Sequence, residues 1–154
     1  MKIKLIGTDI DGVWTDSKIY YNDKGECMKA FSAYDGMGIE ILRKERIPVV
    51  IMTSENSKAV SKRAKKLKIK EVYIGEKNKL NRLETICDKK KITLNDVAYI
   101  GDDINDIQVL NRVSFSALTY NSPIKNKIKV DYITKLKGGD GAFREFVDII
   151  LKEK

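Results

Sequence analysis

Short apolar runs alternate with amphipathic segments along most of the chain. The runs that read as strands are 2–9, 49–52, 72–75, 97–100, 114–117 and 132–133. Helical spacing is found over 35–46, from Thr53 to about 68, over about 78–90, in a short stretch to 110, and over 142–151. This alternation is typical of a parallel sheet wrapped by helices. We therefore predict a mainly parallel α/β fold, and the 154 residues fit one domain over 1–154.

Residues 17–31 interrupt this alternation. One arm carries Ile19, Tyr20 and Tyr21, residues 22–25 (NDKG) have the composition of a turn, and the other arm contains Met28 and Phe31. We predict a β-hairpin inserted after the first strand. Because a lone hairpin buries little surface, its aromatic residues need a partner surface.

The composition excludes several classes of chemistry. The sequence contains no histidine, which removes Ser–His and Cys–His nucleophiles and histidine metal ligands together. Cys27 and Cys87 lie far apart, so neither a disulfide framework nor a zinc site is indicated. No apolar stretch is long enough to span a membrane, and the first run is too short and too soon acidic for a signal peptide. We expect a cytoplasmic protein without a membrane partner.

The net charge of +8 raises the question of nucleic-acid binding. The basic residues are spread through predicted helices, as in 43–46, 65–70 and 88–91, with neither interleaved aromatic residues nor an arginine-rich arm. We interpret them as solvated helix faces that attract anionic substrates, and we expect no nucleic-acid partner.

Polar side chains follow three of the apolar runs. They are Asp9 and Asp11 after the first, Thr53 and Ser54 after the second, and Asp102, Asp103 and Asp106 after the fourth, with Lys79 near the start of a helix between the last two. Ligands of open α/β sheets bind beyond the carboxyl ends of the strands. Each residue alone has an ordinary alternative, such as a helix cap for Thr53 or a surface position for Lys79.

Asp9 and Asp11 are two residues apart in an extended segment, so their side chains point the same way. Two neighbouring carboxylates repel each other unless a cation or hydrogen-bond donors compensate. Oxygen ligands of this kind favour Mg2+. The spacing therefore indicates a Mg2+ site, against the alternative of an acidic turn at Gly12.

In these positions the chain resembles the haloacid dehalogenase superfamily of phosphatases. DIDG (9–12), Thr53, Lys79 and GDDIND (101–106) match its four motifs. The resemblance implies a Rossmann-like three-layer sandwich with Asp9 as nucleophile and Asp11 as general acid and base. It also implies Mg2+ held by the Asp9 carboxylate, the Asp11 carbonyl and Asp102.

The proposed chemistry is consistent with the residue types. Mg2+ and Lys79 offset the repulsion between the Asp9 carboxylate and a phosphate dianion, while Thr53 and Ser54 bind the phosphate. Asp11 protonates the departing alkoxide and later deprotonates the attacking water. Asp103 and Asp106 would orient metal-bound waters.

The spacing between the motifs leaves no room for a cap domain. The hairpin and the segment GGDGAFRE (138–145) resemble a capless branch that acts on terminal phosphates of 3-deoxy-2-ulosonic sugar acids. The branch implies a homotetramer in which hairpins pair and neighbouring subunits cover each site. The alternative is a solvent-exposed β-arm.

The helix after Thr53 offers a choice between substrates. Glu55, Arg63 and Lys66 share one side, where they would hold the hydroxyls and carboxylate of a sugar acid or form a solvated face. The TSE tripeptide (53–55) with Arg63 and Lys66 resembles the subgroup for nine-carbon acids, 2-keto-3-deoxynononate or N-acylneuraminate 9-phosphate. We therefore expect a nine-carbon substrate, with the eight-carbon 3-deoxy-D-manno-octulosonate 8-phosphate as the alternative.

Two other classes remain open. A phosphoacceptor signalling module shares the acidic pair, the Thr and the Lys, but the late GDDIND segment (101–106) favours turnover over storage of the phosphoryl group. The other class is a non-catalytic assembly domain of the kind fused to acylneuraminate cytidylyltransferases.

Overall fold

A computed structural model describes residues 2–152. Its strands are β1 Leu5–Thr8, β2 Tyr20–Asn22, β3 Gly25–Met28, β4 Val49–Thr53, β5 Glu71–Ile74, β6 Val97–Gly101, β7 Phe115–Leu118 and β8 Tyr132–Ile133. Its α-helices are α1 Ala33–Lys44, α2 Lys58–Lys66, α3 Lys79–Lys90, α4 Ile107–Leu110 and α5 Ala142–Lys152. Short 3-10 turns cover Leu94–Asp96 and Ile104–Asp106.

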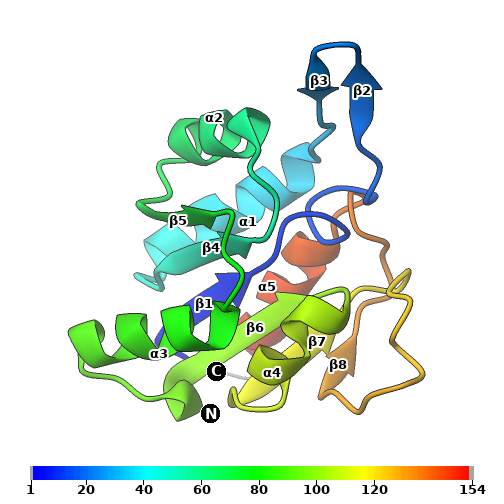
Figure 1. The fold of residues 1–154 in the computed structure, drawn as a ribbon. Helices are drawn as coiled ribbons and strands as arrows, with labels where there is room; N and C mark the ends of the chain where they lie inside the picture. The colour runs from blue at the N-terminus through cyan, green and yellow to red at the C-terminus, as the bar shows by residue number, and fades with distance from the viewer. Residues whose placement is uncertain (1, 153–154) are drawn as a thin grey trace.

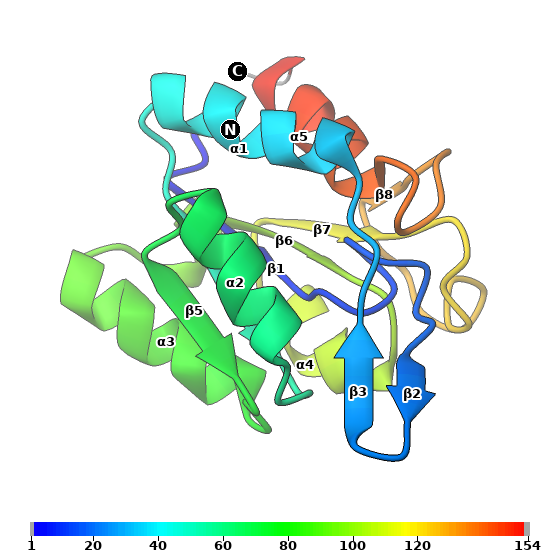
Figure 2. The same cartoon turned by 90° about the horizontal axis from the view of Figure 1, so that it is seen from above.

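Six strands form one sheet in the order β5-β4-β1-β6-β7-β8, and every neighbouring pair is parallel. Helices cover both faces of this sheet (Figures 1 and 2). Buried side chains of α1, α2 and α5 form the core on one face, and those of α3 and α4 form the core on the other. The predicted Rossmann-like sandwich is confirmed, and residues 2–152 contain no cap domain.

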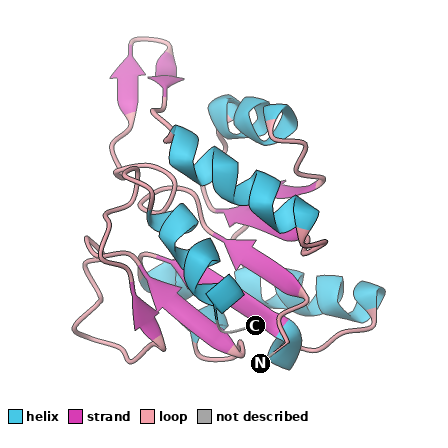
Figure 3. Cartoon of the chain, turned by 180° about the vertical axis from the view of Figure 1, so that it is seen from behind, coloured by secondary structure: helices cyan, strands magenta, loops and turns pink. Residues whose placement is uncertain are grey.

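The central strands form where they do because their side chains are apolar on both faces. Every residue of β1, β4 and β6 is buried, as expected for a parallel strand between two layers of helices. In Figure 3, helices α1 and α5 lie in front of these strands. β1 and β6 are neighbours in the sheet, and their register runs from Leu5 opposite Val97 to Thr8 opposite Ile100.

Local signals set the helix ends. Ser32 caps α1 by accepting a hydrogen bond from the Tyr34 N–H, and Asn78 caps α3 in the same way with Asn81. The helix expected directly after Thr53 begins later, because Ser57 provides its cap and residues 54–57 form a loop. That loop lies at the carboxyl end of β4.

The hairpin forms a separate two-stranded antiparallel sheet that projects from the body (Figures 1 and 3). Its strands are shorter than the predicted segment 17–31. Tyr20, Tyr21 and Met28 are exposed by 45%, 68% and 58%, which leaves an uncovered apolar surface on this arm. Among the described residues, no helix has the length and apolar character to cross a membrane.

Candidate active site

The carboxyl ends of β1, β4 and β6 bring the predicted site residues together. Asp9 follows β1, Thr53 ends β4 and Asp102 follows β6, and all three are buried. The N–H of Asp9 continues the ladder by donating to the Ile100 carbonyl at 3.1 Å. The arrangement follows from the parallel topology, which places the ends of neighbouring strands at one edge.

Three carboxylates gather at this edge. One oxygen each from Asp9, Asp102 and Asp106 lies within 4.8 Å of the others. Burial, followed by the charge of Asp106, raises the pKa of Asp9 to about 7. Burial, followed by the charges of Asp9 and Asp106, raises the pKa of Asp102 to about 8. The cluster is therefore a site whose repulsion a cation would relieve.

Lys79 compensates part of this charge. Its ammonium donates to Asp9 Oδ2 and to Asp106 Oδ1, each at 2.8 Å. Burial lowers the pKa of Lys79, but the two carboxylates outweigh burial and leave that pKa above its ordinary value. Lys79 is the first residue of α3, and the Asn78 cap directly before it fixes where the helix starts.

Asp106 holds several groups in place at once. Its Oδ1 accepts from the Tyr99 hydroxyl at 2.6 Å, and its Oδ2 accepts from the Asp102 N–H at 2.9 Å. Asp103 forms a capping box with Asp106 and also accepts from the Ile104 N–H. These contacts fix the loop that carries Asp102.

Asp11 lies beside the cluster. Its Oδ1 accepts from Lys29 Nζ at 2.5 Å, while its Oδ2 is buried without a hydrogen-bond partner in the described part of the chain. The next residue, Gly12, has φ +84°, and a Cβ there would lie 1.7 Å from Asp102 Oδ2. Glycine is therefore required at position 12 for both the backbone turn and the approach of Asp102.

A cavity of about 140 Å³ opens beside Asp11 and Asp102. Its lining residues are Asp11, Ser17, Thr53, Ser54, Glu55, Asp102, Asp103 and Asn105. Ser54 Oγ accepts from the Asn105 amide at 3.0 Å. Both candidate phosphate-binding residues, Thr53 and Ser54, thus line the same cavity as Asp102.

The three residues expected to select the substrate separate in space. Glu55 is exposed and lines the cavity. Arg63 instead donates to the Ser32 carbonyl at 3.3 Å and lies 5.8 Å from the Phe31 ring. Lys66 is exposed at the last turn of α2. Within one chain, neither Arg63 nor Lys66 lines the cavity.

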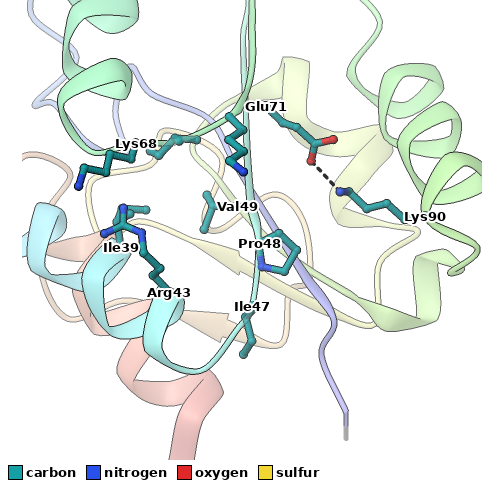
Figure 4. A pocket seen from close by; sticks show the side chains of 10 residues that line it. Ile39, Arg43, Ile47, Pro48, Val49, Lys68, Glu71 and Lys90 are labelled. Carbon is teal, nitrogen blue, oxygen red and sulfur yellow. Dashed lines mark ion pairs between the residues drawn. The ribbon is translucent and has the colours of Figure 1, made fainter.

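A second cavity, of about 450 Å³, lies at the amino ends of β4 and β5 (Figure 4). Ile39, Ile47, Pro48 and Val49 give it an apolar floor. Glu71 on its rim pairs with Lys90 at 3.1 Å. This cavity is larger than the one over Asp102, but it contains no group of the acidic cluster.

The sequence interpretation missed residues that complete the site. Lys29 comes from the end of the hairpin, Tyr99 from inside β6, and Asn105 from the turn before α4. In the sequence, Tyr99 fits the pattern of a buried strand, and nothing there indicates that its hydroxyl contacts the site. Asn105 lies within the GDDIND segment, and only this motif indicated that Asn105 belongs to the site.

Comparisons with known proteins agree with this geometry. A family model described as haloacid dehalogenase-like hydrolase matches residues 51–146. The 3-deoxy-D-manno-octulosonate 8-phosphate phosphatase KdsC of Escherichia coli K12 is 37% identical over 149 residues, which are 97% of this chain and 79% of that protein.

Solved structures are similar over nearly the whole chain. The 3-deoxy-D-manno-octulosonate 8-phosphate phosphatase of Moraxella catarrhalis, in complex with magnesium ion, phosphate ion and KDO, is 38% identical. It has a TM-score of 0.93 and covers 99% of this chain and 87% of its own. The cobalt-bound enzyme of Haemophilus influenzae is 34% identical, with a TM-score of 0.93 and coverages of 98% and 88%.

Proposed function

This chain belongs to the haloacid dehalogenase-like hydrolases and is a phosphoric monoester hydrolase, and we propose that it removes the terminal phosphate of a 3-deoxy-2-ulosonic sugar acid. The observation that carries the proposal is the buried cluster of Asp9, Asp102 and Asp106 around Lys79. Carboxylates and an ammonium at the carboxyl ends of parallel strands are the groups that phosphoryl transfer to a side chain needs.

The eight-carbon acid, 3-deoxy-D-manno-octulosonate 8-phosphate, is the substrate we propose. The relatives with that activity cover this chain almost completely. The nine-carbon expectation depended on Glu55, Arg63 and Lys66, of which only Glu55 lines the cavity of its own subunit. The comparisons therefore favour the alternative over the nine-carbon acid that the sequence first indicated.

The donor set fits Mg2+. Hard oxygen ligands are present, and the pKa values of Asp9 and Asp102 are raised by burial and by neighbouring carboxylates. We propose that the Asp9 and Asp102 carboxylates and the Asp11 carbonyl hold the ion. When bound, Mg2+ would supply positive charge against the phosphoryl oxygens and the carboxylates. The relatives bound to magnesium or cobalt support this assignment.

Asp9 is the proposed nucleophile. Its Oδ1 accepts from the Ile10 N–H at 2.7 Å and its Oδ2 from Lys79, which fixes the carboxylate plane. An oxygen of Asp9 attacks phosphorus, the bond from phosphorus to the sugar oxygen breaks, and Asp11 gives that oxygen a proton. Water then attacks the aspartyl-phosphate, Asp11 takes its proton, and inorganic phosphate leaves.

Lys79, Thr53 and Ser54 are the proposed phosphate ligands. Lys79 is already 2.8 Å from Asp9 Oδ2, so a phosphoryl group attached there would lie within reach of its ammonium. Thr53 and Ser54 line the cavity beside Asp102, and their hydroxyls are donors suited to phosphoryl oxygens. Asp103 and Asp106 would orient waters around the ion, and Asp106 also anchors Lys79.

We propose that the site is completed in a homotetramer. No domain within residues 2–152 covers the cavity, and the hairpin exposes aromatic and apolar side chains that a partner hairpin would bury. Sedimentation of the full chain tests this assembly. A monomer with full activity would contradict the shared cover.

Phosphate release from a panel of sugar-acid phosphates, with Mg2+ or with a chelator, tests the function. We expect Mg2+-dependent release with a higher kcat/KM for the eight-carbon than for the nine-carbon substrate. Asp9→Asn should lower release at least about a thousandfold, while Asp88→Asn at an exposed position of α3 should leave it unchanged. Undiminished release by Asp9→Asn would exclude Asp9 as nucleophile.

A further inference from the structure

We propose that Lys29 is a positioning residue for Asp11 and that Glu26 and Ser57 hold Lys29 in place. The inference rests on the proposed function, in which Asp11 transfers the proton. This inference gives the hairpin a role inside its own subunit, because Glu26 belongs to β3 and Lys29 is the first residue after that strand.

The contact between Lys29 and Asp11 is short and partly buried. Lys29 Nζ lies 2.5 Å from Asp11 Oδ1, and the Lys29 side chain is fully buried. The other oxygen, Asp11 Oδ2, is buried without a hydrogen-bond partner among residues 2–152. Holding one oxygen of a carboxyl group limits its rotation, so the direction of the second oxygen is fixed as well. A group that transfers a proton depends on such a fixed direction.

Lys29 is itself held from the other side. Glu26 Oε2 lies 3.5 Å from Lys29 Nζ, and Glu26 Oε1 accepts from the Ser57 hydroxyl at 2.5 Å. Because an unpaired buried ammonium is costly, the second carboxylate keeps Lys29 compensated while Asp11 is engaged with substrate. The chain of contacts thus extends from Asp11 through the buried Lys29 to Glu26.

Ser57 connects this chain to the phosphate side of the site. It is buried, it caps α2, and it ends the loop 54–57 that follows Thr53. The hairpin base, the Asp11 carboxyl and the loop after β4 are therefore joined by side-chain hydrogen bonds. A displacement of the hairpin would move Asp11 relative to Thr53.

A purely structural ion pair would serve only to anchor the hairpin. Its loss would then lower stability, or lower the turnover of every substrate by the same factor. A positioning role predicts an effect that depends on the leaving group. The sugar oxygen needs a proton from Asp11 as its bond to phosphorus breaks, whereas p-nitrophenolate leaves as a stable anion and needs none.

The test compares Lys29→Met with Lys89→Met, which removes an exposed lysine of α3 outside the hairpin. Each Mg2+-loaded variant is assayed for kcat/KM on 3-deoxy-D-manno-octulosonate 8-phosphate and on p-nitrophenyl phosphate. We expect Lys29→Met to lose about a hundredfold on the sugar phosphate and less than about threefold on the aryl phosphate. Lys89→Met should match the wild type on both.

An equal loss on both substrates, or no loss on either, would overturn the positioning role. If Lys29→Met does not fold, Glu26→Gln decides, because it removes the charge beside Lys29 and retains an acceptor for Ser57. We expect a selective loss of about tenfold on the sugar phosphate, and an unselective one contradicts the proposal. A wild-type chain that releases phosphate from neither substrate would instead refute the proposed function.

Discussion

Lys79 Nζ lies 2.8 Å from Asp106 Oδ1, although 27 residues separate them in the chain. Both side chains are buried. The same ammonium contacts Asp9 Oδ2, so Asp106 determines where Lys79 stands relative to the proposed nucleophile. Asp106 therefore positions Lys79 in addition to lying beside the proposed metal site.

Asp106→Asn tests this support. The variant keeps an acceptor for the Asp102 N–H and loses the charge that holds Lys79. A hydrogen bond to a charged group contributes about 2 kcal/mol, so we expect kcat/KM for phosphate release to fall at least about tenfold. Tyr99→Phe is the matched control, because it removes a hydroxyl from the same Oδ1 and leaves the charge. An equal loss in both variants would show that the charge of Asp106 is not what matters.

Binding of Mg2+ should strengthen as pH rises. The pKa of Asp102 is about 8, raised mainly by burial, so below that pH the ion must displace a proton from the Asp102 carboxyl. Since the folded pKa lies above its ordinary 3.8, the metal-free chain loses stability as pH rises through about 8. Thermal unfolding with and without Mg2+ measures both effects.

We therefore expect the Mg2+-induced rise in Tm to be larger at about pH 8.5 than at about pH 6.5. Asp102→Asn should remove most of that rise. Asp131→Asn, at a carboxylate that accepts from Ser116 away from the cluster, serves as the control. A Tm shift that is the same at both pH values would contradict the assignment of Asp102 as a ligand.

Titration of Asp35 should make the folded state less stable as the pH rises from about 4 to about 6. Asp35 is buried in α1 and accepts from the Arg144 N–H at 2.9 Å, and burial raises its pKa from 3.8 to about 6. A raised acid pKa stabilises the fold below the unfolded value and loses that contribution as pH passes the folded value. The loss is worth up to about 3 kcal/mol between about pH 4 and pH 7.

Asp35→Asn should abolish this part of the pH dependence. Urea unfolding at about pH 4 and pH 7 measures the difference in the free energy of unfolding between variant and wild type. The exposed Asp23→Asn provides the reference. If Asp35→Asn keeps the wild-type slope, the Asp35 carboxyl does not titrate in this range.

Glu55 and Arg63 should behave differently when mutated. Glu55 is exposed in the cavity, so Glu55→Gln should raise KM for the sugar-acid phosphate about tenfold and leave p-nitrophenyl phosphate unchanged. Arg63 contacts the Ser32 carbonyl and lies over Phe31, so Arg63→Met should lower Tm instead. Lys62→Met, at an exposed position of α2, is the control.

A raised sugar KM with an unchanged Tm in Arg63→Met would contradict this division. It would return Arg63 to substrate recognition, as the helix pattern first suggested. The measurement therefore separates a residue that packs the base of the hairpin from one that reads the substrate.

The parts of the site that the sequence revealed share one property. Asp9, Thr53 and Asp102 follow apolar runs, and a parallel sheet places the ends of such runs at one edge. Boundaries were less accurate, since α2 begins at Lys58 after the Ser57 cap and not directly after Thr53.

The amino-acid order by itself determined the alternation of strands and helices, the acidic motifs and the absence of histidine chemistry, because periodicity and composition are local properties. Folding in three dimensions decided which side chains meet across the chain. Lys29 reaches Asp11, Tyr99 reaches Asp106, and Arg63 turns to Ser32. Such contacts depend on how distant segments pack around buried charge, and no local pattern encodes that choice.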